Sequence, residues 1–131
     1  MMKTNAKNIV SAILCEVNRF PVVTEVEINK GIERVLGKDY SGFVIEDDVV
    51  ILYNSDNSGR VNRAVFSEKG DLLEIIRGDF LLCYFPLRKT FENMPENIKN
   101  KYIEKYMYPV RVKICSDNGY SIIPYPPICK E

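Results

Sequence analysis

The residues that could do chemistry in this chain are few, and enzyme signatures are largely missing. The sequence contains no histidine, which is the commonest general base and a frequent metal ligand. It has no phosphate-binding loop, no GxSxG motif and no HExxH motif. We therefore expect a protein without catalytic residues and without a cofactor, which acts by binding.

A run of three carboxylates, Glu46-Asp47-Asp48, lies between two strand-like segments. Adjacent carboxylates could hold a divalent cation, but an oxygen cage needs ligands that converge from several parts of the chain. A solvated turn is the favoured interpretation, and no metal site is predicted. Residues 39–56 carry five carboxylates and no Lys or Arg, which gives this stretch a local net charge of −5.

Two arginines follow the polar stretch NSDNSG, at the start of the next predicted strand. Loop residues such as Asn, Asp and Gly have a structural reason to be there. Strand alternation places Arg63 on the same face as two valines, so its guanidinium should lie near the edge of the core and need a partner. That partner is either a structural ion pair, with Glu74 or Asp79, or a ligand. Arg60 and Asn62 lie on the opposite face.

A segment from 95 to 108 shows the clearest helical pattern, because Ile98, Tyr102 and Tyr106 recur at four-residue spacing. Three lysines flank this stripe: Lys99, Lys101 and Lys105. Basic groups interleaved with aromatic rings can bind nucleic acid. In the simpler interpretation, which we favour, the tyrosines pack on a sheet and the lysines face water. Residues 97–113 have a local net charge of +4.

The remaining pattern predicts an α+β fold with a mainly antiparallel sheet of five or more strands and two helices. The chain is read as one domain, residues 1–131, with an extended proline-rich tail at about 124–131. Helices are expected at 29–37 and 95–108, and strands at 8–17, 22–28, 43–45, 49–53, 61–66, 72–76, 80–85, 110–115 and 120–123.

The four cysteines are far apart and form no CxxC pair. No export signal or membrane-spanning segment is recognisable, so we expect reduced thiols, a cytoplasmic location and no membrane partner. The net charge of zero counts against a generally basic DNA binder and against a strongly acidic DNA mimic.

Four segments, GIERVLG, VVILYNSDNSGRVNRAV, EIIRGDFLLC and FENMPENIKNKYIEKY, resemble a small uncharacterised family, the domain of unknown function numbered thirty-eight forty-six. The resemblance covers about residues 13–109, with an Asn-Arg pair at Asn62-Arg63 and a Gly-Phe element at Gly78 and Phe80. It implies a phage, plasmid or integrating element of Gram-positive bacteria, near antirestriction-type genes. It implies no catalytic residues.

Our leading hypothesis is a non-catalytic interaction protein of a phage or mobile element, in the cytoplasm of a bacterial host. The more specific form is an inhibitor of a host defence nuclease, of the anti-CRISPR or antirestriction type, that binds a nucleic-acid-handling complex. The expected contact surface combines the 54–63 loop with the acidic turn: Glu46, Asp47, Asp48, Arg60, Asn62 and Arg63. The alternative is a module that binds a nucleotide or single-stranded nucleic acid through Arg60, Arg63 and the three helix lysines. If neither surface is used, the C-terminal tail is the next candidate.

Overall fold

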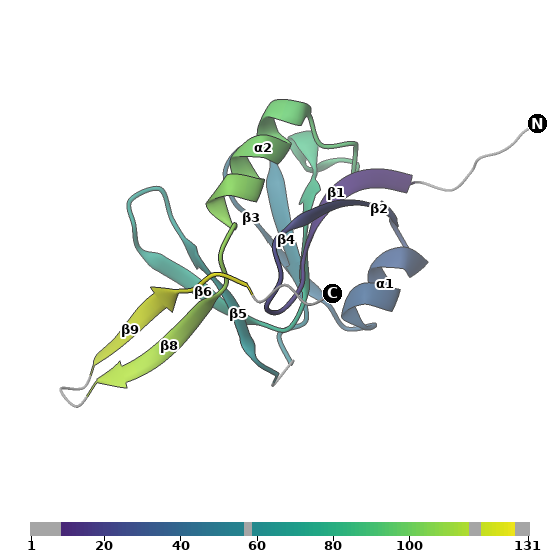
Figure 1. The fold of residues 1–131 in the computed structure, drawn as a ribbon. Coiled ribbons are helices and arrows are strands. Elements are labelled where there is room, and N and C mark those ends of the chain that lie inside the picture. The colour runs from purple at the N-terminus through teal and green to yellow at the C-terminus, as the bar shows by residue number, and fades with distance from the viewer. Residues whose placement is uncertain (1–8, 57–58, 116–118, 128–131) are drawn as a thin grey trace, which may run out of the picture.

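A five-stranded antiparallel sheet forms the centre of the protein in the computed structural model, which describes residues 9–56, 59–115 and 119–127 (Figure 1). Its strand order is β2-β1-β7-β4-β3. Two further two-stranded sheets pair β5 with β6 and β8 with β9. The strands are β1 (Ile9–Cys15), β2 (Val22–Glu27), β3 (Ser41–Val44), β4 (Val49–Tyr53), β5 (Val61–Phe66), β6 (Leu72–Arg77), β7 (Phe80–Tyr84), β8 (Val110–Cys115) and β9 (Gly119–Pro124).

The helices are α1 (Lys30–Leu36) and α2 (Glu96–Lys105), with a short 3₁₀ turn at Pro86–Arg88. The predicted α+β fold with a mainly antiparallel sheet is confirmed. The bounds of β4, β5 and β8 coincide with those expected from hydrophobic alternation. Among the described residues, no helix has the length and apolar character needed to cross a membrane.

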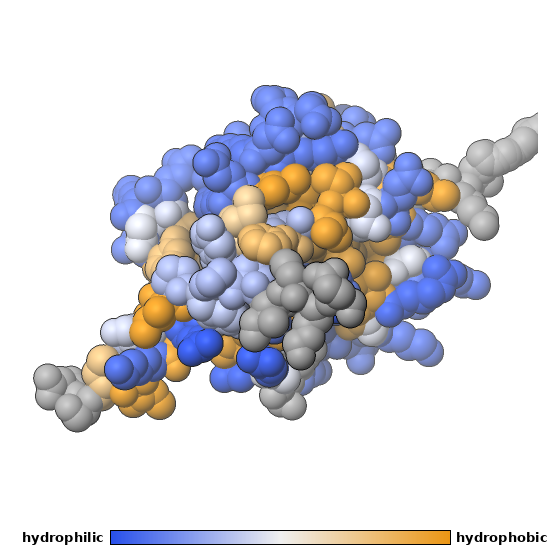
Figure 2. Space-filling view, viewed as in Figure 1, coloured by the Kyte–Doolittle hydropathy of each residue, from blue (hydrophilic) through white to orange (hydrophobic). Residues whose placement is uncertain are grey.

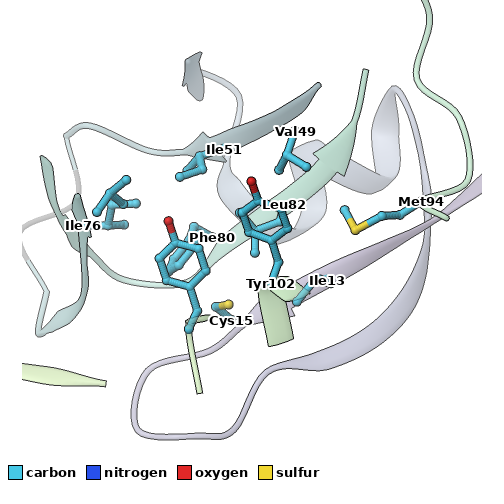
Figure 3. Close-up of a cluster of buried hydrophobic side chains, with 11 residues drawn as sticks. Ile13, Cys15, Val49, Ile51, Ile76, Phe80, Leu82, Met94 and Tyr102 are labelled. Carbon is cyan, nitrogen blue, oxygen red and sulfur yellow. The ribbon is translucent and has the colours of Figure 1, made fainter. Parts of the chain in front are cut away.

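The central sheet is covered on both faces, which explains why β4 and β7 are apolar at nearly every position. One face packs against α1 through Ile32 and Leu36. The other packs against α2 and the β5–β6 hairpin, and its buried cluster includes Phe80, Val65 and Tyr102. Figure 3 shows the Tyr102 ring inside this second cluster, among side chains of the central strands.

Helix α2 is shorter than the pattern predicted, because it ends at Lys105 rather than at Tyr108. The next residue, Tyr106, leaves the helical conformation with φ −109° and ψ 28°. Tyr102 and Tyr106 of the predicted stripe are buried as expected, whereas Ile98 is only half-buried. The carbonyls of Tyr106 and Met107, just beyond this helix end, accept hydrogen bonds from the Arg63 side chain.

The hairpin of β8 and β9, residues 110–115 and 119–124, projects from the body of the protein, and we call it the arm (Figure 1). At its root, β8 lies next to β5. The Tyr125 amide donates to the Pro109 carbonyl at 3.0 Å, which closes the base of the arm.

The thiols give a direct test of this arrangement. Cys15, Cys83 and Cys115 are free, and Cys129 lies outside the described residues. Burial raises the pKa of Cys15 and Cys83 to about 12, whereas Cys115 is exposed on the arm.

In a Cys129→Ser background, we expect iodoacetamide to modify Cys115 in the native protein and all three thiols only after unfolding. Fast native labelling of Cys15 or Cys83, measured by peptide mass spectrometry, would contradict the fold. Incomplete labelling after unfolding would contradict the reduced state.

Candidate functional site

Arg63 is the most unusual residue of the structure, because it is charged and only 1% exposed. Its Nε donates to the Tyr106 carbonyl at 3.0 Å. Nη1 donates to the Asn62 side chain at 2.6 Å and to the Glu16 carbonyl at 3.3 Å. Nη2 donates to the carbonyls of Arg19 and Met107 at 2.8 and 3.3 Å. A guanidinium has five N–H donors, so these five hydrogen bonds leave none for a ligand.

Asn62 is equally committed to the interior, with no exposed surface. Its amide nitrogen donates to the carbonyls of Cys15 and Gly78, each at 2.9 Å, and its oxygen accepts from Arg63. The prediction that Asn62 and Arg63 contact a partner is therefore wrong: both side chains are buried and their polar atoms are used internally.

The predicted ion pair of Arg63 with Glu74 or Asp79 is also wrong. The guanidinium is held by backbone carbonyls and an amide oxygen, while Asp79 instead accepts a hydrogen bond from the Val17 amide at 2.9 Å. Desolvation lowers the pKa of Arg63 from its usual value, but an arginine keeps its proton at physiological pH. The buried charge is thus compensated by dipoles, including those at the C-terminal end of α2.

These contacts join three separate parts of the chain, which we call the Arg63 cage. Glu16 and Arg19 belong to the turn between β1 and β2. Tyr106 and Met107 follow α2 and lead into the arm, and Arg63 itself comes from β5. The cage fixes the path of the chain from the helix to the root of the arm.

The acidic turn lies against α2 and is largely neutralised by it. Lys105 Nζ lies 3.3 Å from Glu46 Oε2, and Lys101 is paired with Asp47. The Tyr102 hydroxyl donates to the Glu46 carbonyl at 3.0 Å and lies 3.1 Å from Asp47 Oδ2. The charge runs seen in the sequence are therefore not two separate patches but partners in one interface inside the molecule.

The backbone of the acidic turn has an unusual conformation. Asp47 and Asp48 have φ values of 62° and 59°, a left-handed region that Asp tolerates better than most residues. The Val49 amide donates to the Glu46 carbonyl at 3.2 Å and closes the turn. The turn holds two of its carboxylates toward α2 and leaves Asp48 exposed.

The surface predicted from the 54–63 loop and the acidic turn does not exist as one surface. The two segments flank opposite ends of β4, a separation of about 17 Å for a five-residue strand. Instead, Glu46 lines a shallow hollow with Ser67, Glu68 and Asp71 of the β5–β6 turn. Arg60 is exposed at the other end, and residues 57–58 of the loop lie outside the described residues.

The lysines proposed as nucleic-acid contacts are mostly committed to acidic partners. Lys101 and Lys105 bind Asp47 and Glu46, and Lys99 lies 3.8 Å from Glu96 on the same helix. In the part of the chain that the structure describes, no group of three or more acidic or cysteine side chains is arranged to hold a metal ion.

The arm carries the surface that sequence reasoning missed. The cross-strand pairs are Val110 with Pro124, Val112 with Ile122, and Ile114 with Tyr120, so these six residues share one apolar face. Its root packs against the body, where Val110, Ile122 and Pro124 line a cleft with Phe66 and Met107. Toward the tip, Ile114 is 84% exposed and Tyr120 is 53% exposed. Figure 2 shows hydrophobic atoms on this projecting part.

The sequence shows the apolar alternation of this hairpin, V-x-V-x-I on one strand and Y-x-I on the other. It does not show which part of the protein covers the apolar face. Sequence patterning reports that one face of a hairpin is apolar. It does not report whether the body of the protein is long enough to cover that face. Here the body covers only the root, where Val110, Val112 and Ile122 are half-buried.

Comparisons with known proteins add no relatives to this picture. No protein-family model, no curated protein and no solved structure matches the chain. The resemblance inferred from the sequence segments therefore has no support beyond those segments.

The Arg63 cage predicts that replacing this arginine strongly lowers the stability of the protein. Arg63→Met keeps much of the volume but removes the guanidinium donors from four backbone carbonyls and from the Asn62 oxygen, and should lower the free energy of unfolding by about 3–5 kcal/mol. The matched control is Arg60→Met, whose side chain is exposed and should change stability by less than about 0.5 kcal/mol. Urea denaturation measures both, and equal effects would contradict the cage.

The acidic turn predicts a pH-dependent effect of Asp47→Asn. The hydrogen bond from Lys101 lowers the pKa of Asp47, with a further contribution from Tyr102, against a desolvation effect of opposite sign. The folded state therefore favours the ionised carboxylate, and the stabilisation is present at neutral pH and lost as the pH falls through the lowered pKa.

Asp47→Asn should accordingly be less stable than wild type at pH 7, by up to about 1 kcal/mol because the pair is partly exposed, and should match wild type in acid below the lowered pKa of Asp47. Asp48→Asn, in the same backbone conformation, is the control and should differ little at either pH. Urea denaturation at both pH values checks this. A difference that persists unchanged in acid would contradict the role of the ionised carboxylate.

Proposed function

We propose that this protein acts by binding another protein and that its main contact is the exposed pair Ile114 and Tyr120, which we call the tip of the arm. The observation that carries the proposal is the apolar face that continues beyond the body, with Ile114 84% exposed and Tyr120 53% exposed. Exposed apolar side chains that lie together, as these two cross-strand neighbours do, are typical of surfaces that a partner covers. Tyrosine is also enriched where protein interfaces carry their binding energy.

The attachment of the arm supports this proposal. An isolated two-stranded hairpin is marginally stable in water, so a projecting one needs a firm root. The Arg63 cage holds Tyr106 and Met107 directly before β8, and the Arg111 guanidinium stacks 4.6 Å from the centre of the Tyr125 ring. A root fixed in this way reduces the conformational entropy lost when the tip binds.

The class of partner comes from the sequence resemblance. A phage or mobile-element protein in a bacterial host would have a defence nuclease as its target, and such nucleases present basic surfaces to nucleic acid. The carboxylates of Glu68 and Asp71, which line the hollow, would supply a second, acidic contact. Direct nucleic-acid binding has less support, because Lys101 and Lys105 are paired with carboxylates.

The test compares the same substitution on the two faces of the arm. Tagged protein is used to capture partners from the lysate of a bacterium with an active defence nuclease, after the lysate has been digested to remove nucleic-acid bridges. Ile114→Asp places a charge on the apolar face and should weaken capture of the nuclease by about tenfold or more. Lys113→Asp changes the neighbouring residue on the opposite face and should retain most of the capture.

The same two variants are then expressed in cells that carry the nuclease and are challenged with phage. Wild type and Lys113→Asp should raise the plating efficiency, and Ile114→Asp should not. Capture that survives Ile114→Asp would contradict the arm as the contact. Capture without any effect on plating would contradict inhibition while leaving the contact in place.

A further inference from the structure

The outer edge of β9 is a second feature of the arm, distinct from its apolar face. In the described structure β8 is the strand of the arm that lies next to β5, so β9 forms the outer edge of the arm. The hydrogen-bond pattern of that edge follows from two facts. First, Pro124 has no N–H and so cannot donate to its partner Val110. Second, the Tyr125 amide donates to the Pro109 carbonyl, one residue beyond the Val110–Pro124 pair on each strand. Both facts identify Val110–Pro124 as a non-hydrogen-bonded pair of the antiparallel ladder.

Pairs in an antiparallel ladder alternate, so Ile122 and Tyr120 also belong to non-hydrogen-bonded pairs with β8. Their backbone N–H and C=O groups therefore point away from β8, toward the outer edge. Tyr120 and Ser121 are exposed and Ile122 is half-exposed, so this edge presents two donors and two acceptors that β8 does not satisfy.

Edge strands are usually protected against pairing by charges, by proline or by being very short. The edge strand β2 carries Glu25 and Glu27, and β3 has only four residues. In contrast, β9 has six residues, GYSIIP, with no charge and with a proline only at the root. Among these edges, the middle of β9 is the segment most open to another strand.

We propose that β9 pairs with β9 of a second copy of this chain, so that two arms form a four-stranded antiparallel ribbon. The sequence of the edge is self-complementary about Ser121. With a two-fold axis there, Tyr120 of each copy forms a hydrogen-bonded pair with Ile122 of the other, and all four outward N–H groups find carbonyl acceptors. A second copy thus satisfies the outward N–H and C=O groups of Tyr120 and Ile122.

Side chains and charges fit the same partner. On the apolar face, Tyr120 of one copy lies beside Ile122 of the other, a favourable aromatic and β-branched pair. On the opposite face the two Ser121 hydroxyls meet and can bond to each other. The cations Arg111 and Lys113 lie on β8, which is the outer strand of the ribbon in each copy. The cations of one copy are therefore about 14 Å from those of the other, and they repel weakly in physiological salt.

The dimer would also enlarge the apolar surface of the arm. The exposed Ile114 and Tyr120 side chains of both copies would lie on one continuous face of the ribbon. The interface itself is small, with four backbone hydrogen bonds and few side chains, so the dimer is weak and concentration-dependent. Self-association does not depend on the proposed partner, and it can be measured without one.

The test uses opposite charges at Ser121, the residue on the two-fold axis. Sedimentation equilibrium of wild type should show a weight-average mass that rises with concentration from 15.1 kDa toward twice that value. Ser121→Lys and Ser121→Asp should each weaken the dimer by about tenfold, because like charges then lie directly opposite. An equimolar mixture of the two variants should restore association. Lys113→Asp, on β8, should dimerise like wild type.

Two results would overturn the proposal. A wild-type protein that stays at 15.1 kDa up to millimolar concentration does not pair through β9. A dimer that is abolished by Ile114→Asp but is unaffected by either Ser121 variant uses the apolar faces instead of the edges.

Discussion

The buried guanidinium of Arg63 is the constraint on which the arrangement of this protein depends. Taking an arginine out of water costs several kcal/mol, and one that is 1% exposed must recover this through its hydrogen bonds. Four backbone carbonyls and the Asn62 side chain provide the acceptors. Because the acceptors come from the β1–β2 turn and from the end of α2, satisfying one charge fixes the relative positions of three segments.

That constraint extends to the surface proposed for binding. The chain leaves the cage at Met107 and enters β8 at Val110. The arm therefore begins three residues after the last cage contact, and the cage sets its direction. The acidic turn then fixes the other side of α2, through Lys101, Lys105 and Tyr102. Helix α2 is thus held between two polar contacts, and the apolar tip projects from a rigid root.

Much of the fold could be predicted from the sequence because hydrophobic alternation and turn residues locate strands well. Alternation also placed Arg63 near the core. It failed on the partners, since backbone carbonyls carry no signature in the sequence. It also failed on Asn62, which was assigned to the opposite face. The ladder with β6 shifts register between Val61 and Arg63, and the irregularity leaves both Asn62 and Arg63 buried. The charge runs were visible, but not that they pair with each other.

The central claim is that Arg63 fixes the arm relative to the body, and a distance measurement tests it most directly. Spin labels are placed on Cys115 in the arm and on Glu25→Cys in β2, in a Cys129→Ser background, where Cys15 and Cys83 are buried. Pulsed electron resonance should give one narrow distance distribution for this protein. Arg63→Lys retains the charge but has three donors instead of five, and it should broaden the distribution while the protein stays folded. A folded Arg63→Lys variant with an equally narrow distribution would contradict the account.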